Sequence, residues 1–277
     1  MKTNSAETCP QAPVALTIAG SDSGGGAGIQ ADIKTFAALG VFGTSAITCI
    51  TAQNPSSVTG IQPIDPEMVD RQIKAVCDGF PVAAAKTGML YSSQIIKIVA
   101  ADDVRQGIPI LVVDPVMVAS SGARLLKTDA VDTLCKDLLP QARVITPNLN
   151  EAEILCGHVI SSLDAMRAAA AEIGDRFDVA CAVKGGHLPG DEVVDVLYDE
   201  GEEYLFKSAR VQVEQSHGAG CAFSAAITAY LAKGDLLKDA VGKAKEFVRQ
   251  ALLNAQATGR YRPLGFFWDF APSSGNP

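Results

Sequence analysis

A regular alternation of apolar strand patterns with helical patterns constrains the fold of this chain more than any other feature. Residues 110–113 form a continuous apolar run, typical of a strand buried on both faces of a parallel sheet. Further on, an alanine-rich helical pattern at 162–173 is followed by a strand pattern at 179–183. Parallel strands need crossover connections, so the alternation predicts an α/β fold with a mainly parallel sheet and helices on both faces.

The end of this alternation contains a hairpin and a glycine-rich turn. Residues 193–207 predict a hairpin that turns at Glu200 and Gly201. An alternating segment at 209–213 predicts one more strand, and 222–233 predicts a buried helix closed by a glycine. Residues 1–13 are polar and predict a flexible N-terminal tail, and 14–277 shows no linker or repeat, which indicates a single domain.

Composition excludes several classes of protein. The chain has 277 residues, 48% of them hydrophobic, and a net charge of −8, which disfavours a general nucleic-acid binder. Its seven cysteines are scattered and contain no C-x-x-C pair, so neither a disulfide framework nor a zinc site is indicated and a reducing cytoplasm is expected. No signal peptide and no apolar run of about 18 residues is found, so we expect no membrane partner.

The glycine-rich turn at 216–221 is the first candidate ligand site. Gly218 and Gly220 stand where the helix begins, so they leave unpaired amide groups at the positive end of its dipole. Such a turn can hold an anion within a cleft. A tight turn that binds nothing explains the same residues equally well.

A second glycine-rich segment, 20–28, follows the first predicted strand. Its Gly26-Ala27-Gly28 triplet fits a loose dinucleotide-binding pattern, but residues 41–60 contain no acid to hold a ribose. We therefore favour a loop that lets a small ligand approach the backbone beside Asp22, with helix capping or turn formation as the alternative role of that carboxylate.

Polar residues follow most of the predicted parallel strands. In such sheets the carboxyl ends of the strands line the ligand crevice. The residues concerned are Asp22, Gln53, Lys86, Asp114, Asn148, Glu151, Lys184 and the turn at 218–221. Their common position predicts a single site more strongly than any one motif does.

This set of side chains is suited to phosphoryl transfer. Lys184 could offset the charge of a triphosphate, while Asn148, Glu151 and Asp114 could hold Mg²⁺ directly or through water. The chain has no P-loop motif, so the phosphate cradle would be the turn at 218–221. Within it, the helix dipole could lower the pKa of the Cys221 thiol and make it a base or nucleophile, although inert packing is the commoner role of a free cysteine.

Seven ordered segments resemble the motifs of the hydroxymethylpyrimidine (phosphate) kinases of thiamine biosynthesis. They are residues 19–32, 51–54, 86–90, 113–117, 146–151, 184–187 and 217–221, and the likeness extends over roughly 14–268. The resemblance implies a ribokinase-like three-layer α/β/α sandwich. It also implies that ATP phosphorylates 4-amino-5-hydroxymethyl-2-methylpyrimidine and then its monophosphate, and that the protein is a homodimer.

The resemblance also assigns roles to individual residues. Gln53 would read the pyrimidine, surrounded by Gly20, Asp22, Met89 and Val116. The nucleotide and its metal would face Lys184, Asn148, Asp114 and the turn with Gly218, Ala219 and Gly220, with Glu151 behind. Cys221 would stand where sugar-kinase relatives place their aspartate base. Two alternatives remain open, namely a pyridoxine or pyridoxal kinase of the same fold and a ligand-binding homologue that has lost catalysis.

Ala219 departs from the family pattern, which usually has threonine at this position. The missing hydroxyl removes one contact to phosphate, about 1 kcal/mol of binding, while the backbone amides remain. We therefore expect Ala219→Thr to lower the apparent KM for ATP in steady-state kinetics. An unchanged or higher KM would show that this hydroxyl is unimportant.

Overall fold

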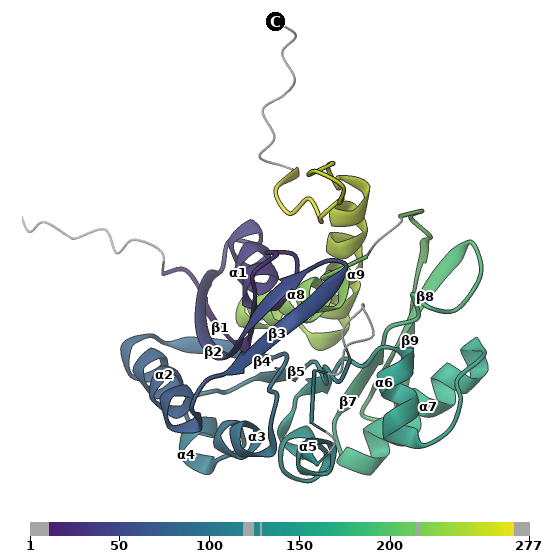
Figure 1. The fold of residues 1–277 in the computed structure, drawn as a ribbon. Coiled ribbons are helices and arrows are strands. Elements are labelled where there is room, and N and C mark those ends of the chain that lie inside the picture. The colour runs from purple at the N-terminus through teal and green to yellow at the C-terminus, as the bar shows by residue number, and fades with distance from the viewer. Residues whose placement is uncertain (1–10, 119–124, 128, 214–215, 269–277) are drawn as a thin grey trace, which may run out of the picture.

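The computed structural model describes residues 11–118, 125–127, 129–213 and 216–268. In this part of the chain the strands form one sheet in the order β3-β2-β1-β4-β5-β6-β7-β8-β9 (Figure 1). The strands are β1 (Val14–Asp22), β2 (Phe42–Asn54), β3 (Ser57–Pro63), β4 (Val82–Thr87), β5 (Leu111–Val113), β6 (Val144–Ile145), β7 (Ala180–Val183), β8 (Glu192–Asp199) and β9 (Glu202–Ala209). Most of the predicted tail, 1–10, lies outside the described residues.

In the order of the sheet, β2, β1, β4, β5, β6 and β7 pair in parallel, as the alternation predicts. Antiparallel hairpins extend both edges, with β3 beside β2 and with β8 and β9 beyond β7. The predicted turn of the second hairpin is confirmed, because Glu200 and Gly201 both have positive φ.

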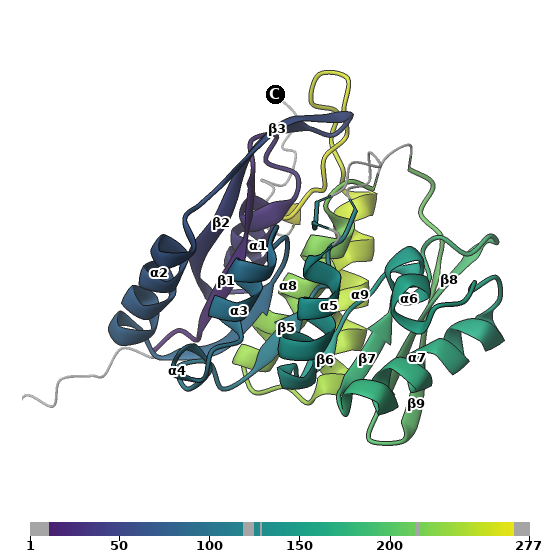
Figure 2. The same cartoon turned by 60° about the horizontal axis from the view of Figure 1, so that its bottom comes forward.

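Helices cover both faces of the sheet and complete the expected three-layer sandwich (Figures 1 and 2). The helices are α1 (Gly28–Ala38), α2 (Pro66–Gly79), α3 (Ser93–Val99), α4 (Asp102–Arg105), α5 (Ala130–Thr133), α6 (Leu149–Cys156), α7 (Leu163–Phe177), α8 (Ala219–Ala232) and α9 (Leu237–Leu253). One face carries α1, α8 and α9, and the other carries the helices from α2 to α7. None of the helices in the described part of the chain combines the length and apolar character needed to cross a bilayer.

The strand order explains where a ligand crevice opens. After β1 the chain crosses by α1 to β2 on one side, and after β3 it returns by α2 to β4 on the other side of β1. Because right-handed crossovers in opposite directions lie on opposite faces, the loops after β1 and β4 diverge. In sheets of this kind, ligand crevices open at the carboxyl ends of the strands.

Three local predictions differ from the structure. The sequence shows helical patterns at 92–103 and 128–138, each of which predicts one helix. In the structure the first is divided into α3 and α4, and the described residues of the second form the short α5 followed by a π-helical turn at Leu134–Leu138. The strand expected at 209–213 is wrong beyond Ala209, where β9 ends. There the Arg210 guanidinium donates to the carbonyl oxygens of Gly186, Leu188 and Gly190, which ties this segment to the loop after β7 in place of a strand ladder.

Aromatic residues near the C-terminus pack against the body of the protein. Phe266 is buried, and the Trp268 ring lies 5.1 Å from that of Phe247 on α9. Tyr261 reaches the tip of the β2–β3 hairpin, where its hydroxyl lies 3.0 Å from that of Ser56.

A buried ion pair joins α1 to β4 beneath the crevice. The Lys86 ammonium donates to Asp32 at 2.9 Å, and the Thr17 hydroxyl donates to the same carboxylate at 2.6 Å. All three residues have no exposed surface. Burial raises the pKa of Asp32, and the adjacent Lys86 opposes that rise, so the carboxylate depends on its cation.

We predict that Lys86→Met lowers the free energy of unfolding by about 3–5 kcal/mol, because it leaves a buried carboxylate without its counter-ion. Denaturant unfolding would measure the loss. The control is the double variant Lys86→Met with Asp32→Asn, which should recover most of the stability because no charge is left unpaired. A single variant as stable as the native chain would contradict this account.

Candidate active site

A cleft of about 450 Å³ opens at the carboxyl ends of the parallel strands. Most of the residues expected at the site line it. They are Gln53, Asp114, Val116, Asn148, Glu151, Lys184, Gly218, Ala219, Gly220 and Cys221. The predicted convergence therefore holds for the ends of β2, β5, β6 and β7, whereas Lys86 of β4, also expected there, is fully buried in its ion pair and does not line the cleft.

Two glycine loops interlock at one wall of this cleft. Gly218 has a φ of +87°, and a Cβ atom there would lie 1.8 Å from the carbonyl oxygen of Gly26. Glycine is therefore required for both conformation and space. Helix α8 begins at Ala219, three residues earlier than the sequence predicts, so Gly220 and Cys221 belong to its first turn.

The first turn of α8 presents free hydrogen-bond donors to the cleft. The Ala219 amide donates to Ser216 and the Ala222 amide to Gly218, but those of Gly220 and Cys221 have no acceptor among the described residues. No side chain caps the helix. The turn therefore offers the unpaired amides and positive dipole that an anion requires.

Lys184 places a cation beside these amides. A Cβ atom on Gly220 would lie 3.4 Å from the Lys184 Nζ atom, which itself donates to Asp114 at 2.9 Å. Asp114 is buried and also contacts Ser224 of α8 at 3.1 Å. Burial lowers the pKa of the Lys184 ammonium, but the carboxylates of Asp114 and Glu151 raise it by more, so Lys184 remains charged.

Asn148 and Glu151 form a capping box at the start of α6. The Asn148 Oδ1 atom accepts from the Glu151 amide at 2.9 Å, and the Glu151 carboxylate accepts from the Asn148 amide at 2.8 Å. Burial raises the pKa of Glu151 to about 7, with Asp114 adding to the rise and Lys184 opposing it. Both residues therefore cap α6, and both also line the cleft.

The expected activation of Cys221 by the helix dipole is wrong. Burial raises the pKa of its thiol to about 11, and the nearby Lys86 offsets only part of that effect. Desolvation of the thiolate outweighs the contributions of the Lys86 ammonium and the Gly28 amide, both of which lower the pKa of the thiol. Cys221 is a neutral thiol at the wall of the cleft.

Comparison with known proteins identifies the family. The sequence model described as phosphomethylpyrimidine kinase matches residues 22–264. The chain belongs to this family. It is 46% identical over 246 residues to the hydroxymethylpyrimidine/phosphomethylpyrimidine kinase of Bacillus subtilis, covering 88% of this chain and 91% of that one. The corresponding kinase of Rhizobium meliloti is 48% identical, with 86% and 90% covered.

Solved structures confirm the ribokinase-like fold expected for this kinase. A pyridoxal kinase from Staphylococcus aureus, in complex with AMP-PCP and pyridoxal, has a TM-score of 0.85 and 35% identity, covering 94% of this chain and 96% of its own. A phosphomethylpyrimidine kinase from Clostridium difficile has a TM-score of 0.76 and 40% identity, covering 86% and 99%. The chain also matches the thiamine biosynthesis bifunctional protein of Geobacter sulfurreducens, of which it spans 50%. The protein is a phosphotransferase.

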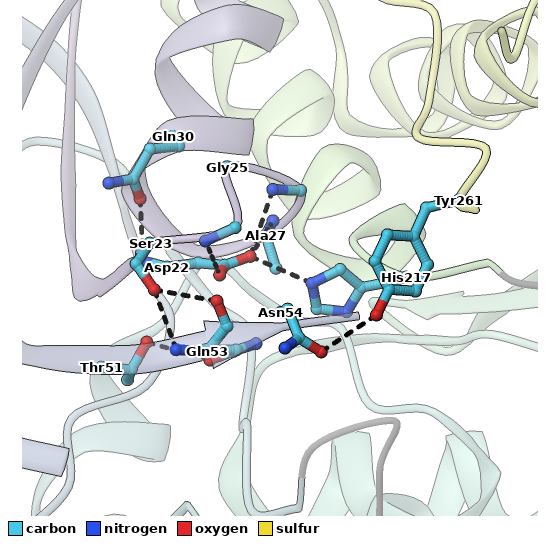
Figure 3. Close-up of polar contacts among 12 residues, drawn as sticks. Asp22, Ser23, Gly25, Ala27, Gln30, Thr51, Gln53, Asn54, His217 and Tyr261 are labelled. Carbon is cyan, nitrogen blue, oxygen red and sulfur yellow. Dashed lines mark hydrogen bonds and ion pairs between the residues drawn. The ribbon is translucent and has the colours of Figure 1, made fainter. Parts of the chain in front are cut away.

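Three residues expected around the substrate lie outside the lining of the kinase cleft. Gly20 and Met89 pack around the buried Cys49, whose Sγ atom would lie 2.7 Å from a Cβ on Gly20. Asp22 faces its own loop, where it accepts from the amides of Gly24 and Ala27, each at 2.8 Å (Figure 3). Asp22 thus performs the loop-capping role that the sequence left open.

His217 is a structural member of the site that sequence reasoning did not single out. Its Nε2 atom lies 3.0 Å from the Asp22 carboxylate, and its ring packs against Gly26 (Figure 3). The contact joins the loop after β1 to the start of α8, and His217 lowers the pKa of Asp22 even though burial opposes this. The position of His217 directly before Gly218 is the sequence feature that could have identified it as part of the site.

A second buried pair, Asp195 on β8 and Lys245 on α9, was also missed. The Lys245 ammonium donates to the Asp195 carboxylate at 2.8 Å. The same carboxylate accepts from the Gly185 amide at 2.8 Å, which fixes the loop that carries Lys184. A single acid within a strand pattern gives no sequence signal of this kind.

We predict a pH-dependent stability effect of Glu151. A folded pKa near 7 lies above the ordinary 4.5, so the folded state holds an extra proton between these values and its stability falls as pH rises through them. Glu151→Gln keeps the capping box but cannot ionise. Denaturant unfolding at pH 5 and pH 8 should show the variant gaining stability relative to the native chain at the higher pH. A pH-independent difference would contradict the raised pKa.

Proposed function

We propose that the protein uses ATP to phosphorylate 4-amino-5-hydroxymethyl-2-methylpyrimidine and then its monophosphate in thiamine biosynthesis. The names of its relatives support this substrate. The single observation that carries the proposal is the free amides of α8, the Lys184 ammonium and Gln53 lining one cleft. Phosphoryl transfer needs an anion site and a substrate site at this proximity.

In this proposal the triphosphate binds at the start of α8. The Gly220 and Cys221 amides would donate to its oxygens, with Gly218 permitting the turn and Ala219 contributing its backbone alone. Lys184 would offset the charge that develops during transfer. Neighbouring kinase structures that bind AMP-PCP and ADP support ATP as the donor.

Mg²⁺ is the proposed metal, and the oxygen-rich side chains of the cleft suit it. Asp114 and Glu151 supply carboxylates, and Asn148 supplies an amide oxygen. Mg²⁺ in kinases is held by one or two carboxylates together with water and substrate phosphates. When bound, it neutralises charge on the phosphate oxygens. Within the described residues no group of three or more His, Cys, Asp and Glu forms a metal site by itself.

Cys221 is proposed as the group beside the reacting hydroxyl. With a pKa of about 11 the thiol is almost entirely protonated at neutral pH, and a protonated thiol cannot accept a further proton. Only the small thiolate fraction would therefore take the proton of the substrate hydroxyl, returning to the thiol as the oxygen attacks the phosphoryl group. Gln53 and Val116 complete the pocket for the pyrimidine, and Gly20 and Met89 pack behind Val116 around Cys49. A homodimer and a cytoplasmic location complete the proposal.

A pyridoxine or pyridoxal kinase is the second candidate. The observation that favours it is the similarity to pyridoxal kinases from S. aureus and B. subtilis, with TM-scores of 0.85 and 0.83. We place the pyrimidine first because the kinases that are 46–48% identical to this chain are named for hydroxymethylpyrimidine and phosphomethylpyrimidine.

One assay tests the proposal directly. The purified chain is incubated with Mg-ATP and a panel of aminopyrimidine, pyridoxine and pyridoxal alcohols, and products are identified by mass. We expect mono- and diphosphorylated pyrimidine as the main products, and a Cys221→Ala variant that lowers kcat about 100-fold, on the scale of a lost general base. Exclusive phosphorylation of pyridoxal would establish the second candidate, and no product would indicate a ligand-binding homologue. An undiminished kcat in Cys221→Ala would exclude the base role.

A further inference from the structure

The hydroxyl of Thr51 has two acceptors but only one hydrogen. Thr51 is buried near the end of β2, and its Oγ1 atom lies 2.9 Å from the carbonyl oxygen of Ser21 and 3.1 Å from the side-chain oxygen of Gln53 (Figure 3). A threonine hydroxyl donates a single hydrogen and accepts through its lone pairs. The two contacts therefore cannot both be full hydrogen bonds in this arrangement.

The two acceptors differ in what they can exchange. The Ser21 oxygen belongs to the main chain and can only accept, and it is the shorter contact. It lies beside the register shift between Ala19 and Ser21 in the pairing of β1 with β2. A carboxamide has two ends of nearly the same shape, so its hydrogen-bond partners decide which end faces which way.

We propose that Thr51 is a positioning residue that orients the Gln53 carboxamide. The Thr51 hydroxyl donates to Ser21, and its lone pair accepts from the Gln53 NH₂ group. The Gln53 carbonyl oxygen then points into the cleft, where it presents an acceptor to the substrate. This inference rests on the proposed function and extends it to the choice between substrates.

The backbone of Gln53 is fixed, so rotation of its side-chain amide is the freedom that Thr51 controls. The backbone amide of Gln53 donates to the Ser23 hydroxyl at 2.8 Å, and that hydroxyl donates to the backbone carbonyl oxygen of Gln53 at 2.8 Å (Figure 3). The next residue, Asn54, accepts from the amides of Ser56 and Ser57 and from the Tyr261 hydroxyl. The strand end that carries Gln53 is therefore held on both sides.

A Gln53 side-chain oxygen that faces the cleft distinguishes the two candidate substrates. The pyrimidine carries an amine next to the hydroxymethyl group that receives phosphate, and an amine donates to a carbonyl oxygen. Pyridoxal carries an aldehyde there, whose oxygen can only accept. Two facing acceptors leave a desolvated polar group unpaired, which weakens binding of pyridoxal.

The test compares Thr51→Val with Thr51→Ser in the full-length chain. Valine has nearly the same shape but no hydroxyl, so the carboxamide loses its orientation, whereas serine keeps it. We expect Thr51→Val to raise KM for the aminopyrimidine about fivefold to tenfold, the scale of one hydrogen bond, while KM for ATP is unchanged and KM for pyridoxal is unchanged or lower. Thr51→Ser should resemble the native enzyme. Thr51→Ala gives the same comparison if the valine variant does not fold.

A double-variant cycle separates orientation from general damage. In a Gln53→Ala background, Thr51→Val should not raise KM for the aminopyrimidine further, because there is no carboxamide left to orient. Additive effects, or an equal loss for both substrates, would overturn the inference while leaving the proposed function intact. A native enzyme that does not phosphorylate the aminopyrimidine would overturn both.

Discussion

The close approach of two glycine loops is the constraint on which the rest of the site depends. Gly218 fits against the carbonyl oxygen of Gly26 only because it lacks a Cβ atom, and Asp22 and His217 hold the two loops in this position. The approach sets where α8 begins, and thereby where its free amides point. An anion site made of main-chain groups depends on such backbone placement because it has no side chains to adapt.

Buried charges around this constraint are arranged in pairs. Lys86 with Asp32 lies beneath the cleft, Lys184 with Asp114 lines it, and Lys245 with Asp195 fixes the loop after β7. Breaking any one pair would leave an uncompensated charge, so the pairs fix geometry more than they add stability. The arrangement also explains how a chain of net charge −8 can offer a polyanion a local cation.

The sequence predicted the layers and most of the cleft because both follow from periodicity and strand ends. The parallel strands, the second hairpin and α9 have clear apolar periods, and the ligand crevice of such a sheet lies at the strand ends. It failed at 209–213, where Arg210 replaces the strand ladder, and at the thiol of Cys221, where burial outweighs the dipole. The His217 contact joins residues 195 positions apart, which no local pattern reveals.

The most direct test of the account is a crystal structure of the protein with a non-hydrolysable ATP analogue and Mg²⁺. The account predicts phosphate oxygens within hydrogen-bond distance of the amides of Gly220 and Cys221, with the Lys184 ammonium on the same phosphates and the Gly26–Gly218 contact preserved. Phosphates bound elsewhere in the cleft, with the start of α8 facing only solvent or side chains, would contradict it.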